Sequence, residues 1–385
     1  MTNSGSLSVF GWASIADFLG DFLVYRNLVP MDERLPGLDA IRGQINLPAG
    51  RVPRKLQPDY ARVIVHLLNR ARALDKPAAD LQRLIFVGDT RMNDGTAFAN
   101  ICQAGGWPGF AFIASETSEP PATEVVPVSV DHSLYLANRW GALADFDRYL
   151  FQEKFPVDSS TAVIVDLDKT ALGARGRNAH VIDQARVQAV QDTVANLLGN
   201  DFDETAFKTA YQHLNQVEFH PFTGDNQDYL AYVCLILGSD LVDLTSLVEE
   251  IRSARLDSFE TFIQRVEAQV NALPPALADI HSDIYANVQL GDPTPFKAFR
   301  RNEFLRTVSK MGCLGDEASV EQLLAGEIVV TQEVRAMAGE WRQRGAILFG
   351  LSDKPDEASI PTAQLASQGY QAIHRTATHV IGQTD

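Results

Sequence analysis

The chain has 385 residues, of which 45% are hydrophobic and 21% are charged. This composition is typical of a globular protein rather than a disordered one, and the length suits about two domains. A formal net charge of −16 repels nucleic-acid phosphates and anionic membrane surfaces, so we expect neither nucleic acid nor a membrane as a partner.

The cysteines and the N-terminal stretch indicate the cellular compartment of the protein. Cys102, Cys234 and Cys313 lie far apart, without the spacing of a zinc site or the density of a disulfide scaffold. The apolar stretch between residues 7 and 29 is interrupted by aspartates and follows no basic region, so it predicts neither a signal peptide nor a membrane span. We therefore expect a cytoplasmic protein.

The first predicted elements are a helix and a buried strand. Residues 60–74 show the apolar spacing of an amphipathic helix, and residues 83–89 form a nearly continuous apolar run. Such a run is typical of a strand covered on both faces. A weaker strand is expected at 109–113. Residues 114–127 are rich in Ser, Thr, Glu and Pro and predict a loop.

A second apolar run at 161–166 predicts another buried strand. The stretch 173–332 shows helical stripes and no clear strand pattern, which indicates an inserted helical domain. A helix at 333–344 then leads into a third apolar run at 345–353. Two weaker strand candidates, 371–374 and 379–382, are expected to extend the same sheet.

These elements predict an α/β fold with a Rossmann-like parallel sheet and helices on both of its faces. A mainly α-helical domain would be inserted into it. The predicted divisions are 1–172 for the first part of the sheet domain, 173–332 for the helical domain and 333–385 for the rest. Residues 1–50 give no sign of their role.

The three apolar runs reach Asp89, Asp166 and Asp353. The carboxyl ends of neighbouring parallel strands line the crevice where ligands bind, so these acids are expected to converge. The run Asp166-Leu-Asp-Lys-Thr170 could present two carboxylates to one pocket. The alternative for it, and for the acids after Gly88, is a turn whose carboxylates cap the following helix.

Three segments together resemble the signature motifs of haloacid dehalogenase-like hydrolases: the strand ending in Asp166-Leu-Asp168, the run Gly350-Leu-Ser-Asp-Lys-Pro355, and Gly88-Asp-Thr-Arg-Met-Asn-Asp94. The family order begins with the nucleophile motif, whereas here the lysine and acidic motifs precede it. The chain therefore resembles a circularly permuted member whose helical insertion corresponds to the family's cap. The resemblance covers roughly residues 50–180 and 335–385.

The resemblance implies roles for five residues. Asp166 would be the nucleophile, Asp168 the general acid and base, and Ser352 a hydrogen-bond donor to the phosphoryl group. Mg²⁺ would be held by Asp166 and Asp168 together with Asp89 and Asp94, with Asp89 the more direct ligand of the last two. Magnesium suits such a site because hard oxygen ligands neutralise the repulsion among the carboxylates.

Three lysines compete for the lysine motif. Lys55, in the run Arg54-Lys-Leu-Gln-Pro58, fits best, and Lys354 and Lys310 are its rivals. The loop 173–178 carries arginines that could reach a substrate anion or form a solvated hinge. Four side chains are expected to contact substrate: Thr170, Ser352, Lys354 and Arg175.

The implied function is Mg²⁺-dependent hydrolysis of a small phosphorylated metabolite through an aspartyl-phosphate. A phosphomutase or another phosphotransferase would use the same site, and a catalytically idle binding protein would keep only the fold. A haloalkanoate dehalogenase would attack carbon and need neither Asp168 nor a metal. Neither the substrate nor the oligomeric state can be inferred from the sequence.

Overall fold

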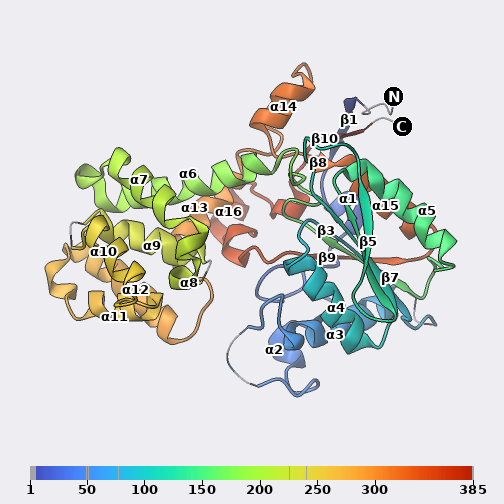
Figure 1. Cartoon of the computed structure of the whole chain (residues 1–385), viewed down its shortest axis with the longest axis horizontal. Helices are drawn as coiled ribbons and strands as arrows, with labels where there is room; N and C mark the ends of the chain where they lie inside the picture. Colours follow the sequence, from blue (N-terminus) through green and yellow to red (C-terminus); the bar gives the residue numbers. More distant parts are fainter. Residues whose placement is uncertain are drawn as a thin grey trace. The chain divides into compact units, whose positions relative to one another are not determined.

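The structure is a computed structural model that describes residues 6–48, 50, 52–76, 78–224, 226–239 and 241–383 (Figure 1). The chain divides into two compact units. The sheet unit comprises residues 1–184 and 307–385, and the helical unit comprises residues 185–306.

A seven-stranded sheet forms the centre of the sheet unit. Neighbouring strands are parallel except for the pair at one edge, β6 and β5, which is antiparallel. The predicted α/β class, with a mainly parallel sheet, is thereby confirmed. In spatial order the strands are β2 (Leu23–Val24), β9 (Ile347–Leu351), β7 (Thr161–Asp166), β3 (Arg83–Gly88), β4 (Gly109–Ala114), β6 (His132–Ala137) and β5 (Thr123–Pro127).

Strand β7 lies between the other two strongly apolar strands, and its six residues are all buried. Its register places Asp166 opposite Leu351 of β9 and Val165 opposite Val87 of β3. The three strands therefore end at the same level. The residues that follow them, including Asp89 and Ser352, emerge at one edge of the sheet, as parallel pairing requires.

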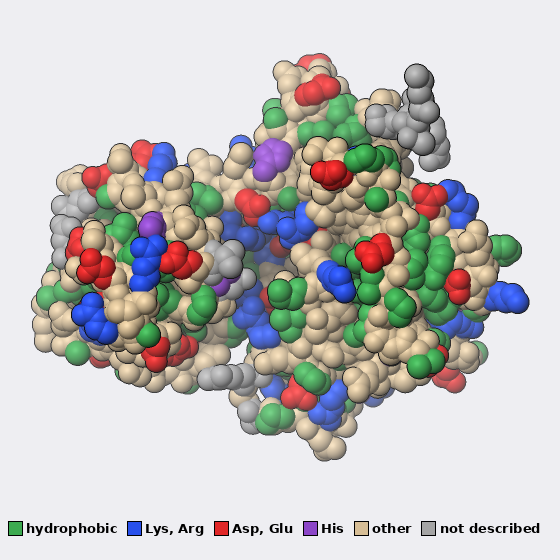
Figure 2. Space-filling view, in the orientation of Figure 1, with side chains coloured by type: hydrophobic (Ala, Val, Ile, Leu, Met, Phe, Trp, Pro, Cys, Tyr) green, Lys and Arg blue, Asp and Glu red, His purple; other side chains and the backbone are tan. Residues whose placement is uncertain are grey.

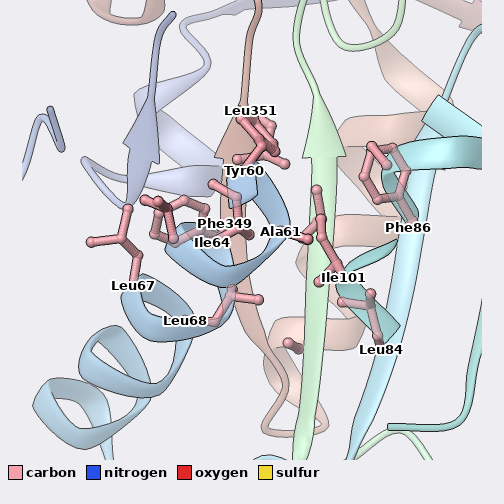
Figure 3. Packing of buried hydrophobic residues seen from close by; sticks show 14 of the residues in the cluster. Tyr60, Ala61, Ile64, Leu67, Leu68, Leu84, Phe86, Ile101, Phe349 and Leu351 are labelled. Carbon is pink, nitrogen blue, oxygen red and sulfur yellow. The ribbon is translucent and has the colours of Figure 1, made fainter. Parts of the chain in front are cut away.

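Helices cover both faces of the sheet. On one face, α3 (Pro58–Asp75) and α4 (Asn93–Gly105) share a core with Phe86 and Ile164, and Figure 3 shows α3 lying against the strands. On the other face, Phe112 contacts Phe146 of α5 (Leu143–Gln152), which contacts Trp341 of α15 (Gln332–Gln343). Burial on both sides explains why the strands lack polar alternation.

A three-stranded sheet joins distant parts of the chain. Strand β10 (Thr378–Gln383) pairs antiparallel with β1 (Leu7–Ala13) and parallel with β8 (Val330–Thr331). Leu7 lies opposite Gln383, so the two ends of the described chain are side by side (Figure 1). The remaining α-helices described in this unit are α1 (Ala16–Leu19), α2 (Leu38–Ile41), α14 (Val320–Gly326) and α16 (Ala363–Ser367).

The helical unit has its own aromatic core, in which Tyr232, Phe259 and Phe262 contact one another. A buried ion network also holds it, because Arg300 binds both Asp228 and Glu303. Its helices, two of which continue into the sheet unit, are α6 (Ala179–Leu198), α7 (Glu204–Leu214), α8 (His220–Thr223), α9 (Gln227–Leu237), α10 (Leu244–Arg252), α11 (Phe259–Glu267), α12 (Pro275–Gln289) and α13 (Lys297–Val308).

The strong predictions from periodicity are confirmed. The helix expected at 60–74 is α3, the helix at 333–344 is α15, and the three apolar runs are β3, β7 and β9. The weaker strand at 109–113 is β4. The compact helical unit, 185–306, is shorter than the expected insertion 173–332, because residues up to 184 and from 307 onward belong to the sheet unit.

Two weak predictions are wrong about the C-terminal segment. The expected strand at 371–374 contains instead a 3₁₀ turn, Ile373–Arg375, where His374 contacts the Tyr25 hydroxyl and Asp21. Side chains rather than a strand ladder hold that segment. Residues 379–382 do form a strand, but β10 belongs to the three-stranded sheet because its partners are β1 and β8.

The loop expected at 114–127 is also partly wrong, because β5 occupies its end. Most of β5 is exposed, so burial leaves little apolar signature in its sequence. None of the helices in the described ranges combines the length and the apolar character needed to cross a membrane. On the face shown in Figure 2, acidic and basic side chains are interspersed rather than segregated.

The central strand should dominate the stability of the sheet unit. We expect Ile164→Ala to lower its free energy of unfolding by about 2–5 kcal/mol, because the residue is fully buried and truncation leaves a cavity. Val130→Ala, at a fully exposed position, should change it by less than about 0.5 kcal/mol. Urea unfolding followed by tryptophan fluorescence measures both, since all four tryptophans lie in the sheet unit. Equal effects of the two substitutions would contradict the described packing.

Candidate active site

The turn after β7 holds Asp166 in place. Lys169 has φ of 66°, a left-handed conformation that costs free energy in a non-glycine residue and is often found at functional sites. Its amide donates to the Leu172 carbonyl at 2.7 Å, and the Thr170 hydroxyl donates to Asp166 Oδ2 at 3.0 Å. The next helix, α6, begins only at Ala179, so neither carboxylate of the Asp166 turn caps it.

Lys55 joins two carboxylates that are far apart in sequence. Its Nζ lies 2.6 Å from Asp94 Oδ1 and 2.6 Å from Asp166 Oδ1, and all three side chains are buried. Its two rivals have other neighbours. Lys354 Nζ is 3.9 Å from Asp168 Oδ2, and Lys310 places its charge near Cys313.

Asp94 also organises the start of α4. Its Oδ2 accepts hydrogen bonds from the amides of Asp89 and Thr90 at 2.9 and 2.8 Å. This is not helix capping, because both amides precede α4 and the N-cap residue of α4, Met92, makes no side-chain cap hydrogen bond. The other oxygen of Asp94 binds Lys55. Gly88 is required beside it, because a Cβ at that position would lie 2.6 Å from Asp94 side-chain carbons.

Asp89, Asp94 and Asp166 form a buried group of carboxylates. One oxygen from each lies within 4.8 Å of the other two. Two cations face this group: Lys55, which contacts Asp94 and Asp166, and Arg175, whose Nε donates to Asp89. Three buried negative charges thus share two positive ones, which leaves an excess of negative charge if all three acids are ionised.

The pKa values of these groups reflect that excess. Burial raises the pKa of Asp89 to about 7, with the charge of Asp94 adding to the effect and Arg175 opposing it. Burial also raises the pKa of Asp166 well above its usual range, although Lys55 opposes this. A hard divalent cation would relieve the same repulsion, and carboxylate oxygens are the ligands that such ions prefer. The group fits a metal ion such as Mg²⁺.

The environment favours the charged forms of Asp94 and Lys55. Burial alone would raise the pKa of Asp94, but Lys55 and the hydrogen bonds to this carboxylate hold it below its usual value. Burial would lower the pKa of Lys55, but the charges of Asp166 and Asp94 raise it well above its usual range. The two acids that Lys55 contacts therefore favour its charged form.

Asp168, which the sequence interpretation placed among the metal ligands, is not one of the three clustered carboxylates. Its side chain is 25% exposed and faces Lys354 at 3.9 Å. It therefore reaches solvent while Asp166 is buried. A partly solvated carboxylate two residues from the buried one suits a proton carrier better than a metal ligand.

Ser352 follows β9 and is buried, with its Oγ accepting from the Lys354 amide at 3.0 Å. The N-terminal segment, for which the sequence indicated no role, holds this loop. Arg26 Nε donates to the Asp353 carbonyl at 2.7 Å, and Arg54 binds the Asp353 carboxylate at 3.1 Å. No sequence motif singled out Arg26, because its partner lies at the other end of the chain.

The residues expected to contact substrate occupy different environments. Thr170 is fully buried and donates to Asp166, an arrangement that orients the carboxylate. Arg175 is partly exposed and paired with Asp89. Arg177, by contrast, is buried between Glu116 and Glu333, so it is neither a substrate contact nor a solvated hinge. Gly176 allows this close packing, since a Cβ there would lie 2.0 Å from the Glu116 carbonyl oxygen.

The helical unit contains a separate cavity of about 670 Å³ between α6, α7, α9 and α10. Its lining is mainly apolar. Its two acids, Asp203 and Asp243, accept hydrogen bonds from backbone amides at the starts of α7 and α10. Helix capping accounts for both of these acids. The candidate catalytic cluster is therefore the group of carboxylates at the end of the main sheet.

Comparison of the chain with protein-family models, with curated proteins and with solved structures finds no match. The interpretation of the site therefore depends on its own geometry and on the motifs in the sequence.

The carboxylate group predicts where a metal binds. We expect isothermal titration calorimetry to detect Mg²⁺ binding, and Asp89→Asn to weaken it roughly tenfold or more because a charged ligand is lost. Asp168→Asn, outside the group, should keep most of the affinity. A saturating metal would also stabilise the fold, by about 2.7 kcal/mol at a concentration a hundred times Kd. Loss of binding in Asp168→Asn but not in Asp89→Asn would contradict this assignment.

Proposed function

We propose that the chain is a metal-dependent phosphohydrolase that acts on a small phosphate ester through an aspartyl-phosphate on Asp166. The observation that carries the proposal is the Lys55 bridge between Asp94 and Asp166. It joins the lysine, acidic and nucleophile motifs of the haloacid dehalogenase-like pattern at one point, although they lie far apart in the chain. Adjacent strands β3, β7 and β9 supply the supporting alignment.

The first chemical step would be in-line attack by an Asp166 carboxylate oxygen on phosphorus. The bond between phosphorus and the ester oxygen breaks, and Asp168 gives its proton to that oxygen, so the leaving group departs as an alcohol. Thr170 and Lys55 orient the attacking carboxylate. The burial of Asp166 keeps competing water from its oxygens.

The second step would hydrolyse the intermediate. Asp168, now a carboxylate, takes a proton from water as the water oxygen attacks phosphorus. The bond between phosphorus and Asp166 breaks, which restores the aspartate and releases inorganic phosphate. The partial exposure of Asp168 suits this exchange of a proton with water.

A divalent metal held by Asp89, Asp94 and Asp166 would supply charge stabilisation for the phosphoryl oxygens. The side chains around the metal would add further positive charge and hydrogen bonds to the binding site of the phosphoryl group. Arg175 is placed to exchange its partner, Asp89, for a substrate anion, since its side chain is 35% exposed. Ser352 and Lys354 lie at the end of β9 beside the nucleophile strand.

The unusual motif order supports a circular permutation of the family's arrangement. The acidic strand β3 precedes the nucleophile strand β7 in sequence yet pairs directly with it. The segment between them contains β4, β5, β6 and α5, which belong to the sheet unit. Permutation keeps such pairings, because it changes only which loops are joined or cut.

Hydrolysis of p-nitrophenyl phosphate tests the proposal. We expect turnover that requires Mg²⁺ and is abolished by Asp166→Asn, because an amide is a poor nucleophile. Asp168→Asn should slow it by roughly 10²–10⁴-fold. Asp145→Asn, a surface residue paired with Arg148, should leave it unchanged. Failure of the wild-type protein to hydrolyse this ester or a broad panel of metabolite phosphates would exclude the proposal.

The assignment of Lys55 rather than Lys310 to the lysine motif has its own test. Lys55→Arg keeps the charge and should preserve the fold, but its wider guanidinium cannot reproduce both 2.6 Å contacts. We expect kcat/KM to fall roughly tenfold or more, as for other misplaced catalytic groups. Lys310→Arg, near Cys313, serves as the matched control and should retain the wild-type value. Circular dichroism confirms that each variant is folded, and a larger loss in the control would reject Lys55.

A further inference from the structure

The hydroxyl of Tyr60 is buried without a hydrogen-bond partner among the described residues. Tyr60 is only 2% exposed, so its hydroxyl lies away from solvent. Two other buried tyrosines have hydroxyl partners: Tyr25 contacts His374, and Tyr232 contacts His281. An unsatisfied buried hydroxyl costs free energy and is rare in native structures. The Tyr60 hydroxyl therefore calls for a partner that the chain itself does not supply.

The position of Tyr60 indicates where that partner would lie. The residue is in the first turn of α3, five residues after Lys55, and it belongs to the same buried cluster as Leu351 at the end of β9 (Figure 3). Its ring belongs to the core cluster that also contains Phe86, Ile164 and Leu351 of the three central strands, which holds the ring in place. The charged groups acting on this hydroxyl are Lys55, Asp353, Asp166 and Asp94. The hydroxyl is thus close enough to these charged groups of the candidate site to be influenced by them.

A second donor faces the same region. The ammonium of Lys55 carries three N–H groups. Two of them are used by Asp94 and Asp166, and within the described ranges no acceptor is seen for the third. Lys55 and Tyr60 act on each other electrostatically, so the two unused donors are near one another. Two such donors suit an anionic ligand with several acceptor oxygens, such as a tetrahedral phosphoryl group.

We infer that Tyr60 is a substrate-contacting residue, whose hydroxyl donates a hydrogen bond to a non-bridging oxygen of the phosphoryl group that Asp166 attacks. This inference rests on the proposed function. Such a donor, fixed by core packing before the substrate binds, stabilises the negative charge on the equatorial oxygens without reorganising in the transition state. Neither motif matching nor periodicity identifies it, because in sequence Tyr60 belongs to the apolar face of a helix.

Tyr60→Phe tests this role, because it removes one oxygen that no described residue binds. With p-nitrophenyl phosphate and Mg²⁺, we expect kcat/KM to fall roughly tenfold to a hundredfold, as for loss of a hydrogen bond to a charged group. The inhibition constant of orthovanadate should rise by a similar factor. The melting temperature should stay equal or increase, because a buried unsatisfied hydroxyl has been removed.

The matched control is Tyr135→Phe. Tyr135 is buried in β6, three strands from β7 in the same sheet, and its substitution should change neither kcat/KM nor the vanadate constant. Wild-type kinetics in Tyr60→Phe, with or without a lower melting temperature, would overturn the inference. The proposed function would then still stand if the wild-type protein turns over and Asp166→Asn does not.

Absence of turnover in the wild-type protein would instead overturn the proposed function. Calorimetric titration with inorganic phosphate in the presence of Mg²⁺ would then test the donor pair alone. Weaker phosphate binding in Tyr60→Phe than in wild type and Tyr135→Phe would support Tyr60 as an anion contact. Equal binding in all three proteins, or no binding by any, would reject it.

Discussion

The arrangement at the end of the sheet depends on the ammonium of Lys55. It lies 2.6 Å from one oxygen each of Asp94 and Asp166, and the three groups are buried together. Carboxylates removed from water keep their charge only if a cation or hydrogen bonds compensate for lost hydration. Through these two contacts of Lys55, the loop before α3, the first turn of α4 and the end of β7 are held at a common point.

The rest of the sheet unit supports that contact from several sides. Parallel pairing aligns the ends of β3, β7 and β9, and the left-handed Lys169 turns the chain so that Thr170 reaches back to Asp166. The N-terminal segment contributes β2 at the sheet edge and Arg26, which holds the loop after β9. The site is therefore assembled from segments spread over almost the entire chain, and no contiguous part contains it.

Sequence reasoning succeeded where burial leaves a strong pattern. Strands β3, β7 and β9 are buried on both faces, and α3 and α15 each bury one apolar face. The hydrophobic pattern of the sequence therefore predicts all five elements. It failed at β5, which is mostly exposed, and at β6, which was not anticipated at all. It also assigned β10 to the main sheet, because strand partners such as β1 and β8 cannot be read from local pattern.

The sequence by itself determined the α/β class, the aspartates at the strand ends and the candidate set of site residues, because strand burial and residue type are local properties. Only the tertiary structure decided which members of that set meet. It grouped Asp89, Asp94 and Asp166 but not Asp168, and it distinguished Arg177, buried in its ion pairs, from Arg175, which is partly exposed and paired with Asp89. These outcomes depend on distances between residues far apart in the chain, which packing sets and spacing in sequence does not.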